Sequence, residues 1–410
     1  MIATRMKKLL VNLTVLVISL ILVALAAEVY LRLFGSPIFV RPHQQLFVRH
    51  DPLLGWSLIP NKSARHITSE YNIDESLNSK GIRGPEYAYD KRPGEYRVMM
   101  LGDSFVEGYS VEFEEVTSQV LQNLLTERGH PDCTVINGGT GGWSTDQEYL
   151  FFQNEAYKYH PDLTILMFHP NDIVGNVEKG QFRGLKPRFL LVNGELTLTN
   201  VPVPDPAQIP DESANTDEGL LLKAKQWLFA NSRLYILFQG FVTNNHNLHL
   251  LAIKLGLAES PGENGELLPV PIEVKMYARS YDAETRQAWE LTEALIVSLK
   301  EAVLSAQSKL VVFYVPPSAA IYDNEWQATK TKFGISDTDW SIHQAANELK
   351  AVCEKNGIGF IDPTSRFLAQ AERLREQDGL LYFPHDAHWT AGGHRLSAEI
   401  LADHIISGAP

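Results

Sequence analysis

Cysteine is nearly absent from this chain of 410 residues, which has only Cys133 and Cys353. Two thiolates cannot complete a tetrahedral zinc site without histidine ligands. Cys133 begins a predicted strand, whereas Cys353 lies on a predicted helix that precedes a different strand. We therefore expect two isolated, buried thiols, with a disulfide as the alternative in an exported protein.

One group of three histidines lies close together in the sequence, namely His385, His388 and His394. A metal site is one interpretation of this cluster. Asp386 and Trp389 adjoin it, however, and an aspartate beside a histidine is typical of a catalytic triad. We therefore predict neither a metal ion nor a cofactor.

Positive charge is also scarce, since 36 Lys and Arg residues face 49 Asp and Glu residues, for a formal net charge of −13. Nucleic-acid binding needs clustered Lys and Arg to contact phosphates, so this charge balance argues against such a partner. Hydrophobic residues make up 44% of the chain, which is enough to fill a core. Length and composition thus agree with a folded enzyme.

One long apolar run lies near the N-terminus, where basic residues at positions 5, 7 and 8 precede Leu9–Ala27. Its nineteen residues are enough to span a bilayer, and the preceding positive charge predicts an exported remainder. Ala24-Leu25-Ala26 also fits a signal-peptidase site, so a cleaved signal peptide is the main alternative. We favour a retained single-pass anchor in the inner membrane, because Glu28–Phe34 continues the run as an amphipathic helix. The rest of the chain would then be periplasmic or extracellular.

Two segments far apart in the sequence have the residues of a nucleophilic triad. Ser104 follows the apolar strand predicted over Arg97–Leu101, and His385-Asp386-Ala387-His388-Trp389 lies near the C-terminus. A serine just after a buried strand acts as a nucleophile when a histidine takes its proton and a carboxylate orients that histidine. Each segment alone is more often a turn or a helix cap. Together they indicate a serine hydrolase or acyltransferase with Ser104, His388 and Asp386 as catalytic residues.

Two further loops have residues suited to binding an oxyanion. Asn137-Gly138-Gly139-Thr140-Gly141-Gly142 follows a short β-branched strand, and its glycines let backbone N–H groups approach a ligand closely. Asn171 follows the continuous apolar run Leu163–Phe168, which is typical of a parallel strand buried on both faces. A flexible strand-to-helix loop and a helix cap are the respective structural alternatives.

These four elements, in this order, resemble the sequence blocks of the SGNH (GDSL-type) hydrolase superfamily. Gly102-Asp103-Ser104 is similar to the serine block, Gly142 to the glycine of the second, Asn171 to the asparagine of the third and His388 to the histidine of the last. The resemblance implies an α/β fold, a flavodoxin-like doubly wound parallel sheet, with Ser104 as nucleophile and His388 as general base oriented by Asp386. It also implies an oxyanion hole made of the Ser104 and Gly142 backbone N–H groups and the Asn171 side-chain amide.

Two departures from the superfamily pattern bear on these assignments. His169 stands where the third block usually has glycine, and one residue separates Asp386 from His388 where two are common. The shorter spacing resembles the Asp-x-His-Trp element of the alginate O-acetyltransferase-like branch, in which that element precedes the serine. The resemblance covers residues 95–175 and 305–405 well and the middle of the chain poorly.

The segments between the motifs alternate as strands and helices, as in doubly wound folds. Strands are predicted over 97–101, 134–137, 163–168, 310–315 and 359–361, and helices over 117–128, 146–159, 283–307, 340–356 and 391–406. Right-handed crossovers would bring Ser104, Gly142 and Asn171 to one carboxyl edge of the sheet.

We expect three parts along the chain: an anchor with its juxtamembrane helix (1–34), a membrane-proximal extension of short strands and loops (35–95), and a catalytic domain (96–410). Within the catalytic domain, residues 174–279 form a variable insertion. It has a predicted hairpin over 189–198, which turns at Asn193-Gly194, and an apolar helix from about Leu220 to Leu255. In the extension, Arg83 is expected either at the rim of the active site or in solvent.

Three functions are consistent with the sequence. The first is an exported esterase acting on an acylated carbohydrate or lipid. The second is a polysaccharide O-acyltransferase with the same triad, supplied with acyl groups by a membrane partner. Water or a sugar hydroxyl would attack the acyl-enzyme in the two cases, a difference that sequence does not reveal. The third, a non-catalytic glycan-binding protein on the same fold, is least favoured because the set of catalytic residues is complete.

Overall fold

The computed structural model describes residues 2–34, 43–68, 70–181, 184–205, 227–228, 232–235, 237–238, 270–377 and 379–408. The chain divides into two compact units. The first comprises residues 1–41, 67–69 and 210–265, and the second comprises 42–66, 70–209 and 266–410. Most of the helix predicted over 220–255 lies outside the described residues.

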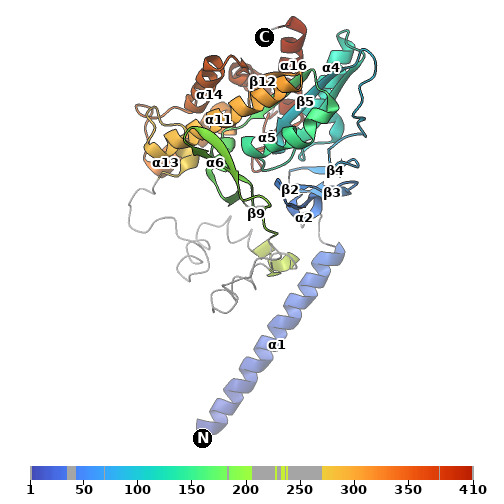
Figure 1. The fold of residues 1–410 in the computed structure, drawn as a ribbon. Helices are drawn as coiled ribbons and strands as arrows, with labels where there is room; N and C mark the ends of the chain where they lie inside the picture. Colours follow the sequence, from blue (N-terminus) through green and yellow to red (C-terminus); the bar gives the residue numbers. More distant parts are fainter. Residues whose placement is uncertain are drawn as a thin grey trace. The chain divides into compact units, whose positions relative to one another are not determined.

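The first unit contains the long helix α1 (Ile2–Phe34) (Figure 1). Within it, Val11–Leu33 is long enough and apolar enough to cross a membrane, and its side chains are not buried by protein. The predicted juxtamembrane segment continues this helix without a break. Near its end, Glu28 accepts hydrogen bonds from the Ser232 hydroxyl (3.0 Å) and from the backbone N–H groups of Arg233 (3.1 Å) and Leu234 (3.0 Å).

The second unit is built on a five-stranded parallel sheet with the order β13-β12-β7-β5-β6. The strands are β5 (Tyr96–Gly102), β6 (Cys133–Gly139), β7 (Leu163–Phe168), β12 (Lys309–Tyr314) and β13 (Gly359–Ile361). The first of these strands in the sequence, β5, lies between the second and the third, so the winding reverses there. This is the flavodoxin-like order, and the predicted fold class is confirmed.

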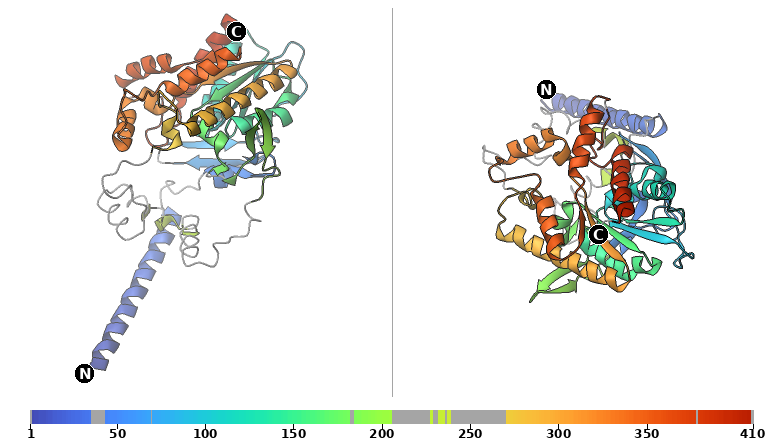
Figure 2. Two further views of the ribbon diagram at one scale, coloured as in Figure 1. Left: turned by 60° about the vertical axis from the view of Figure 1, so that its left-hand side comes forward. Right: turned by 90° about the horizontal axis from the view of Figure 1, so that it is seen from above.

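The four longer strands are largely buried on both faces, whereas the edge strand β13 is only partly buried. Met99 and Leu101 of β5 belong to one hydrophobic cluster, whereas Val98 and Met100 belong to the other, because successive side chains point to opposite faces. Figure 2 shows helices on both sides of the sheet. One face is covered by α5 (Thr145–Asn154), α11 (Ala283–Ser305) and α14 (Gln344–Lys355), and the other by α4 (Thr117–Glu127), α15 (Thr364–Arg375) and α16 (Ala391–Ser407).

Some helix boundaries differ from the prediction. The helix predicted over 146–159 ends at Asn154, and a 3-10 turn (Ala156–Tyr159) follows. The helix predicted over 340–356 begins only at Gln344, because Trp340 pairs with Ala278 in a β-bridge. Helices α13 (Asp323–Phe333) and α15 were not predicted, since they bury few side chains: Trp326 in α13, and Thr364 and Phe367 in α15.

The predicted hairpin is present as β10 (Arg188–Val192) paired with β11 (Glu195–Thr199). Asn193 (φ 54°) and Gly194 (φ 86°) both adopt the left-handed conformation, as an Asn-Gly turn requires. The two cysteines are free and buried, as expected.

Residues 43–76 form the short elements expected between the anchor and the sheet (Figure 1). They are α2 (His43–Phe47), β1 (Val48–Asp51), β2 (Gly55–Leu58), β3 (Ser63–Ile67) and β4 (Asn72–Ser76), with β1-β2 and β3-β4 as separate two-stranded sheets. Trp56 of β2 is almost fully buried, so this part of the extension packs as core rather than as a loose linker.

Candidate active site

Three loops that leave the carboxyl ends of β5, β6 and β7, together with the loop that contains Asp386 and His388, form the candidate site. Ser104 is the first residue of the short helix α3 (Ser104–Glu107), directly after β5. Asp103 caps this helix, and its Oδ1 accepts the Phe105 N–H at 2.9 Å. Asn171 begins α6 (Asn171–Val177) after β7, and Gly142 lies in the loop after β6. The topology therefore brings these residues to the predicted edge of the sheet.

The structure brings together the three residues predicted as a triad. Ser104 Oγ lies 2.7 Å from His388 Nε2, and His388 Nδ1 lies 2.5 Å from Asp386 Oδ1. A hydrogen-bonded chain thus runs from carboxylate through imidazole to hydroxyl. In this chain the imidazole is oriented to accept the serine proton.

The short Asp-x-His spacing is accommodated by the backbone of Ala387. In an extended chain, residues on either side of a central residue point to the same face but lie well apart. Ala387 instead has φ 60°, in the left-handed region that residues with a Cβ rarely adopt. This turn folds Asp386 back onto the His388 ring, so two residues that are close in sequence form a direct hydrogen bond.

Residues of the extension hold the Asp386 loop. The Tyr71 hydroxyl donates to Asp386 Oδ2 at 3.0 Å, and the Glu70 carboxylate accepts the backbone N–H groups of His385 (3.0 Å) and Asp386 (2.7 Å). Burial acts to raise the pKa of Asp386, but the hydrogen bonds from His388 and Tyr71 outweigh it and hold the pKa below its usual value. Asp386 is therefore ionised at neutral pH, as the orienting carboxylate of a triad must be.

Asn171 is fixed by the same aspartate that caps the serine helix. Its Nδ2 donates to Asp103 Oδ2 at 3.0 Å, so Asp103 contacts α3 with one oxygen and Asn171 with the other. His169, which replaces the usual glycine, stacks on Phe105 with ring centroids 5.0 Å apart, and its Nδ1 accepts the Asn171 N–H at 3.3 Å. Burial lowers the pKa of His169, so the neutral imidazole is favoured there. The histidine is thus accommodated as a packing residue beside the serine helix.

The loop that contains Gly142 is held from two sides. Gly142 has φ 76°, a conformation that favours glycine. The preceding residue, Gly141, donates its N–H to Glu107 Oε2 at 2.5 Å and accepts a hydrogen bond from Trp56 Nε1 at 3.1 Å. Glu107, the last residue of α3, and Trp56 of the extension therefore both hold this loop in place.

Several residues around the site were not predicted from the sequence. Tyr71 and Glu70 contact the Asp386 loop, and the Tyr109 hydroxyl lies 3.3 Å from both ring nitrogens of His388. None of them belongs to a recognisable motif, and the contacts of Tyr71 and Glu70 join positions about three hundred residues apart. Only the tertiary structure reveals them.

Both expectations for Arg83 were wrong. Its side chain is buried and lies beneath the serine helix, where it donates to the carbonyl oxygens of Glu107 (3.1 Å) and Val111 (2.6 Å) and also to that of Gly108. A guanidinium with several donors can satisfy successive carbonyls at the end of a short helix, which explains why burial is tolerated.

Among the described residues, one group has ligand-type atoms close enough together to hold a metal ion: His43, Glu75 and Glu107, within 4.8 Å of one another. These residues are distinct from the histidine cluster near the C-terminus that the sequence singled out. They lie behind the Gly141–Gly142 loop, which Glu107 contacts directly.

Two sequence comparisons find proteins that are similar to parts of this chain. The family model described as the SGNH hydrolase-like domain of the acetyltransferase AlgX matches residues 275–409. An arylesterase from Vibrio mimicus is 29% identical over 97 residues, which are 24% of this chain and 44% of that protein. The chain therefore spans less than half the length of this curated relative.

Two solved structures illustrate the more distant likenesses. An acetyl xylan esterase, AlAXEase, is 12% identical, with 77% of this chain and 100% of that chain covered and a TM-score of 0.37. A lipase/acylhydrolase from Enterococcus faecalis is 10% identical, with 76% and 96% covered and a TM-score of 0.37.

The matched family segment contains Asp386 and His388, and Ser104 lies upstream in the serine block. Residues 275–409 are therefore similar to the SGNH hydrolase-like domain of an acetyltransferase, as the resemblance of the sequence blocks implies.

Proposed function

We propose that this chain is an exported serine esterase that cleaves acyl esters of a carbohydrate or lipid, with Ser104, His388 and Asp386 as its catalytic triad. The observation that carries the proposal is the hydrogen-bonded chain from Asp386 through His388 to Ser104, with distances of 2.5 Å and 2.7 Å. A nucleophile, its base and the group that orients the base are thus already in contact.

In the first half-reaction, Ser104 Oγ attacks the acyl carbon while its proton moves to His388 Nε2. The carbonyl oxygen becomes an oxyanion, which we assign to the backbone N–H groups of Ser104 and Gly142 and the Asn171 side chain. One Asn171 N–H is held by Asp103, so the orientation of the amide is set before substrate binds. Preorganised donors of this kind contribute ~3–4 kcal/mol each to transition-state stabilisation.

The tetrahedral intermediate then collapses, and the ester C–O bond breaks. His388 returns its proton to the leaving alcohol, which departs and leaves an acyl group on Ser104. In the second half-reaction His388 takes a proton from water, the resulting hydroxide attacks the acyl-enzyme, and Ser104 recovers the proton as the acid is released.

A second candidate function is O-acyl transfer, in which a sugar hydroxyl replaces water in the second half-reaction. It is favoured by the matched family model, whose description names an acetyltransferase. In that case the acyl group would come from a membrane partner. The same triad and oxyanion donors serve both reactions, because only the attacking oxygen differs.

The location we propose is the inner membrane, with α1 as a single-pass anchor and the site on the periplasmic or extracellular side. The apolar span of α1 and the basic residues before it support this orientation. A cleaved signal sequence would still export the site but release it from the membrane. Detection of residues 2–10 by mass spectrometry in membrane-extracted protein would distinguish the two.

The triad is tested by Ser104→Ala in the full chain, assayed with p-nitrophenyl acetate in detergent. We expect kcat to fall by at least ~10³-fold, since no other group can form the acyl-enzyme. Ser397→Ala is a matched control, because Ser397 is also buried and donates to a backbone carbonyl, that of Gly393 at 3.1 Å, yet lies on α16. Turnover by Ser104→Ala at the wild-type rate would refute the serine mechanism.

Hydrolysis and transfer are separated by supplying an acyl donor with and without oligosaccharide acceptors. Acylated oligosaccharide, detected by mass spectrometry, would identify a transferase. Release of free acid alone, at the same rate with and without acceptor, would identify an esterase.

A further inference from the structure

A buried histidine from the extension contacts two buried glutamates behind the active-site loops. His43 Nε2 lies 3.0 Å from Glu75 Oε2 and 2.9 Å from Glu107 Oε1. All three side chains are almost fully enclosed. The other ring nitrogen, Nδ1, is buried with no hydrogen-bond partner in the described part of the chain, so the polar contacts of this imidazole go to the two glutamates.

Glu107 connects this cluster to the site. It is the last residue of the helix that begins with Ser104, and its other oxygen accepts the Gly141 N–H at 2.5 Å. Gly141 immediately precedes Gly142, whose N–H we assign to the oxyanion hole. One carboxylate therefore joins the serine helix to the oxyanion loop, and His43 holds that carboxylate from behind.

The charges of the cluster balance without a metal ion. Burial acts to lower the pKa of His43, but the negative charges of Glu107 and Glu75 outweigh it and raise the pKa to about 9. A protonated His43 then neutralises one carboxylate, and burial raises the pKa of Glu75, which favours its neutral form.

The remaining neighbours of His43 do not supply another negative charge. The rings of Phe47, Tyr109 and His66 lie with their centroids 4.9 Å, 4.6 Å and 5.3 Å from the His43 ring. Burial and the positive charge of His43 lower the pKa of His66 to about 4, so His66 is neutral at pH 7. The two glutamates are thus the only anions in contact with this imidazole among the described residues.

We propose that His43 is a positioning residue for acyl transfer, which fixes the Gly141–Gly142 peptide through Glu107 in the geometry that binds the oxyanion. This inference rests on the proposed function, since it assumes that an oxyanion forms beside Ser104. Without the imidazole, Glu75 and Glu107 face each other with no cation between them, and Glu107 moves away or takes up a proton. The Gly141 N–H then loses its acceptor and the loop loosens.

The test compares His43→Phe with wild type as full chains in detergent, with p-nitrophenyl acetate as the probe. Phenylalanine retains the stacking on Phe47 and Tyr109 but removes the donor. We expect kcat to fall 10- to 100-fold while KM changes less than about twofold, because a misplaced oxyanion donor affects the transition state more than the bound substrate. Affinity for a trifluoromethyl ketone, which forms an oxyanion on Ser104, should fall in parallel with kcat.

A second variant, Glu107→Gln, tests the same positioning role if His43→Phe does not fold. Its amide is close in shape to the carboxylate but weakens the contacts to His43 and to the Gly141 N–H, so kcat should fall by a similar factor. The matched control is Glu95→Gln, which disrupts a buried ion pair at the opposite end of β5. It should lower thermal stability without changing kcat.

A wild-type kcat in folded His43→Phe or Glu107→Gln would overturn the inference. So would a stoichiometric metal ion in the purified wild type, if chelation removed both the metal and the activity. Failure of the inference is distinguishable from failure of the proposed function. If Ser104→Ala abolishes turnover while the His43 and Glu107 variants are normal, only the positioning role is wrong.

Discussion

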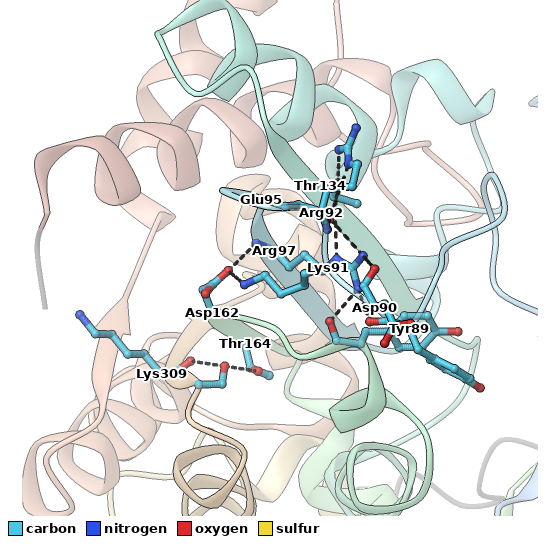
Figure 3. A network of polar contacts seen from close by, with 12 residues as sticks. Tyr89, Asp90, Lys91, Arg92, Glu95, Arg97, Thr134, Asp162, Thr164 and Lys309 are labelled. Atoms are coloured by element: carbon cyan, nitrogen blue, oxygen red, sulfur yellow. Dashed lines mark hydrogen bonds and ion pairs between the residues drawn. The ribbon is translucent and has the colours of Figure 1, made fainter.

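Strand β5 has a network of charged residues at each end, and the two networks differ in how completely their charges are paired. At the amino end, Arg97 donates to the carbonyl oxygens of Tyr89 (2.8 Å), Tyr159 (2.8 Å) and Asp90 (2.9 Å) and to the Glu95 carboxylate at 3.0 Å (Figure 3). Burial acts to raise the pKa of Glu95, but the hydrogen bonds it accepts, first of all from Arg97, outweigh it and lower the pKa to about 2. The opposite charges of Arg97 and Glu95 are thus in direct contact.

At the carboxyl end, buried acids are pushed toward their neutral forms. Burial, followed by the negative charge of neighbouring carboxylates, raises the pKa values of Glu148 and Asp172 well above their usual values. Burial likewise raises the pKa of Glu75 beside His43. Such perturbed groups are typical of functional sites, where the protein does not complete every polar contact itself. We therefore predict that the amino end of β5 contributes mainly to stability and the carboxyl end mainly to activity.

Among variants that compare the two ends of β5, Asp386→Asn should have the largest effect on activity. An asparagine amide would donate toward His388 Nδ1 and favour the wrong tautomer, so kcat should fall by ~10³–10⁴-fold with little loss of stability. The measurement is kcat for p-nitrophenyl acetate. Asp403→Asn, which changes an exposed carboxylate paired with Arg128 and Arg366, is the control and should be active. A loss of less than tenfold for Asp386→Asn would contradict the proposed role.

Asn171→Ala should have the next largest effect. Removing one oxyanion donor typically lowers kcat by ~10²–10³-fold, and KM should change little because the donor acts mainly in the transition state. Steady-state kinetics separate the two parameters. A rise in KM at constant kcat would show instead that Asn171 binds the ground state of the substrate.

Glu95→Gln should have the smallest effect on activity and a clear effect on stability. With kcat unchanged, we expect the free energy of unfolding at pH 7 to fall by roughly 1–2 kcal/mol, because the buried Arg97 loses its carboxylate partner. Because folding lowers the pKa of Glu95 from 4.5 to about 2, its stabilisation is full above about pH 4.5 and is lost as the pH falls through 2. Chemical denaturation of wild type and variant at pH 7, 4 and 3 should show this difference shrinking. A difference independent of pH would contradict the ion-pair explanation.

Much of the fold was predictable, because each strand of the sheet is a short apolar run and each run is followed by a helical pattern. Ser104 and Asn171 directly follow such strands, so their common edge follows from topology alone. The left-handed backbone of Ala387 was not predictable, since alanine gives no sign of a positive φ. The sequence therefore identified Asp386 and His388 but could not explain how so short a spacing brings them into contact.

The contribution of the extension was not predictable either. Tyr71, Trp56 and His43 reach the site through contacts to residues far away in the sequence, and no local periodicity marks them. The burial of Arg83 was not predictable from the sequence either. Its burial depends on several carbonyl oxygens at the end of a four-residue helix, which only the folded chain brings within reach.

The packing of Trp56 against the Gly141 carbonyl has a practical consequence for preparing a soluble form of the enzyme. A recombinant fragment that starts at Tyr96 would include the whole parallel sheet and the three residues of the proposed triad. It would lack the extension side chains, such as Trp56, that contact the glycine loop. Such a fragment would leave apolar core surface exposed and misalign the loop. The shortest useful truncation therefore removes α1 but begins before His43, and what looks like a tether in the sequence is to be treated as part of the enzyme.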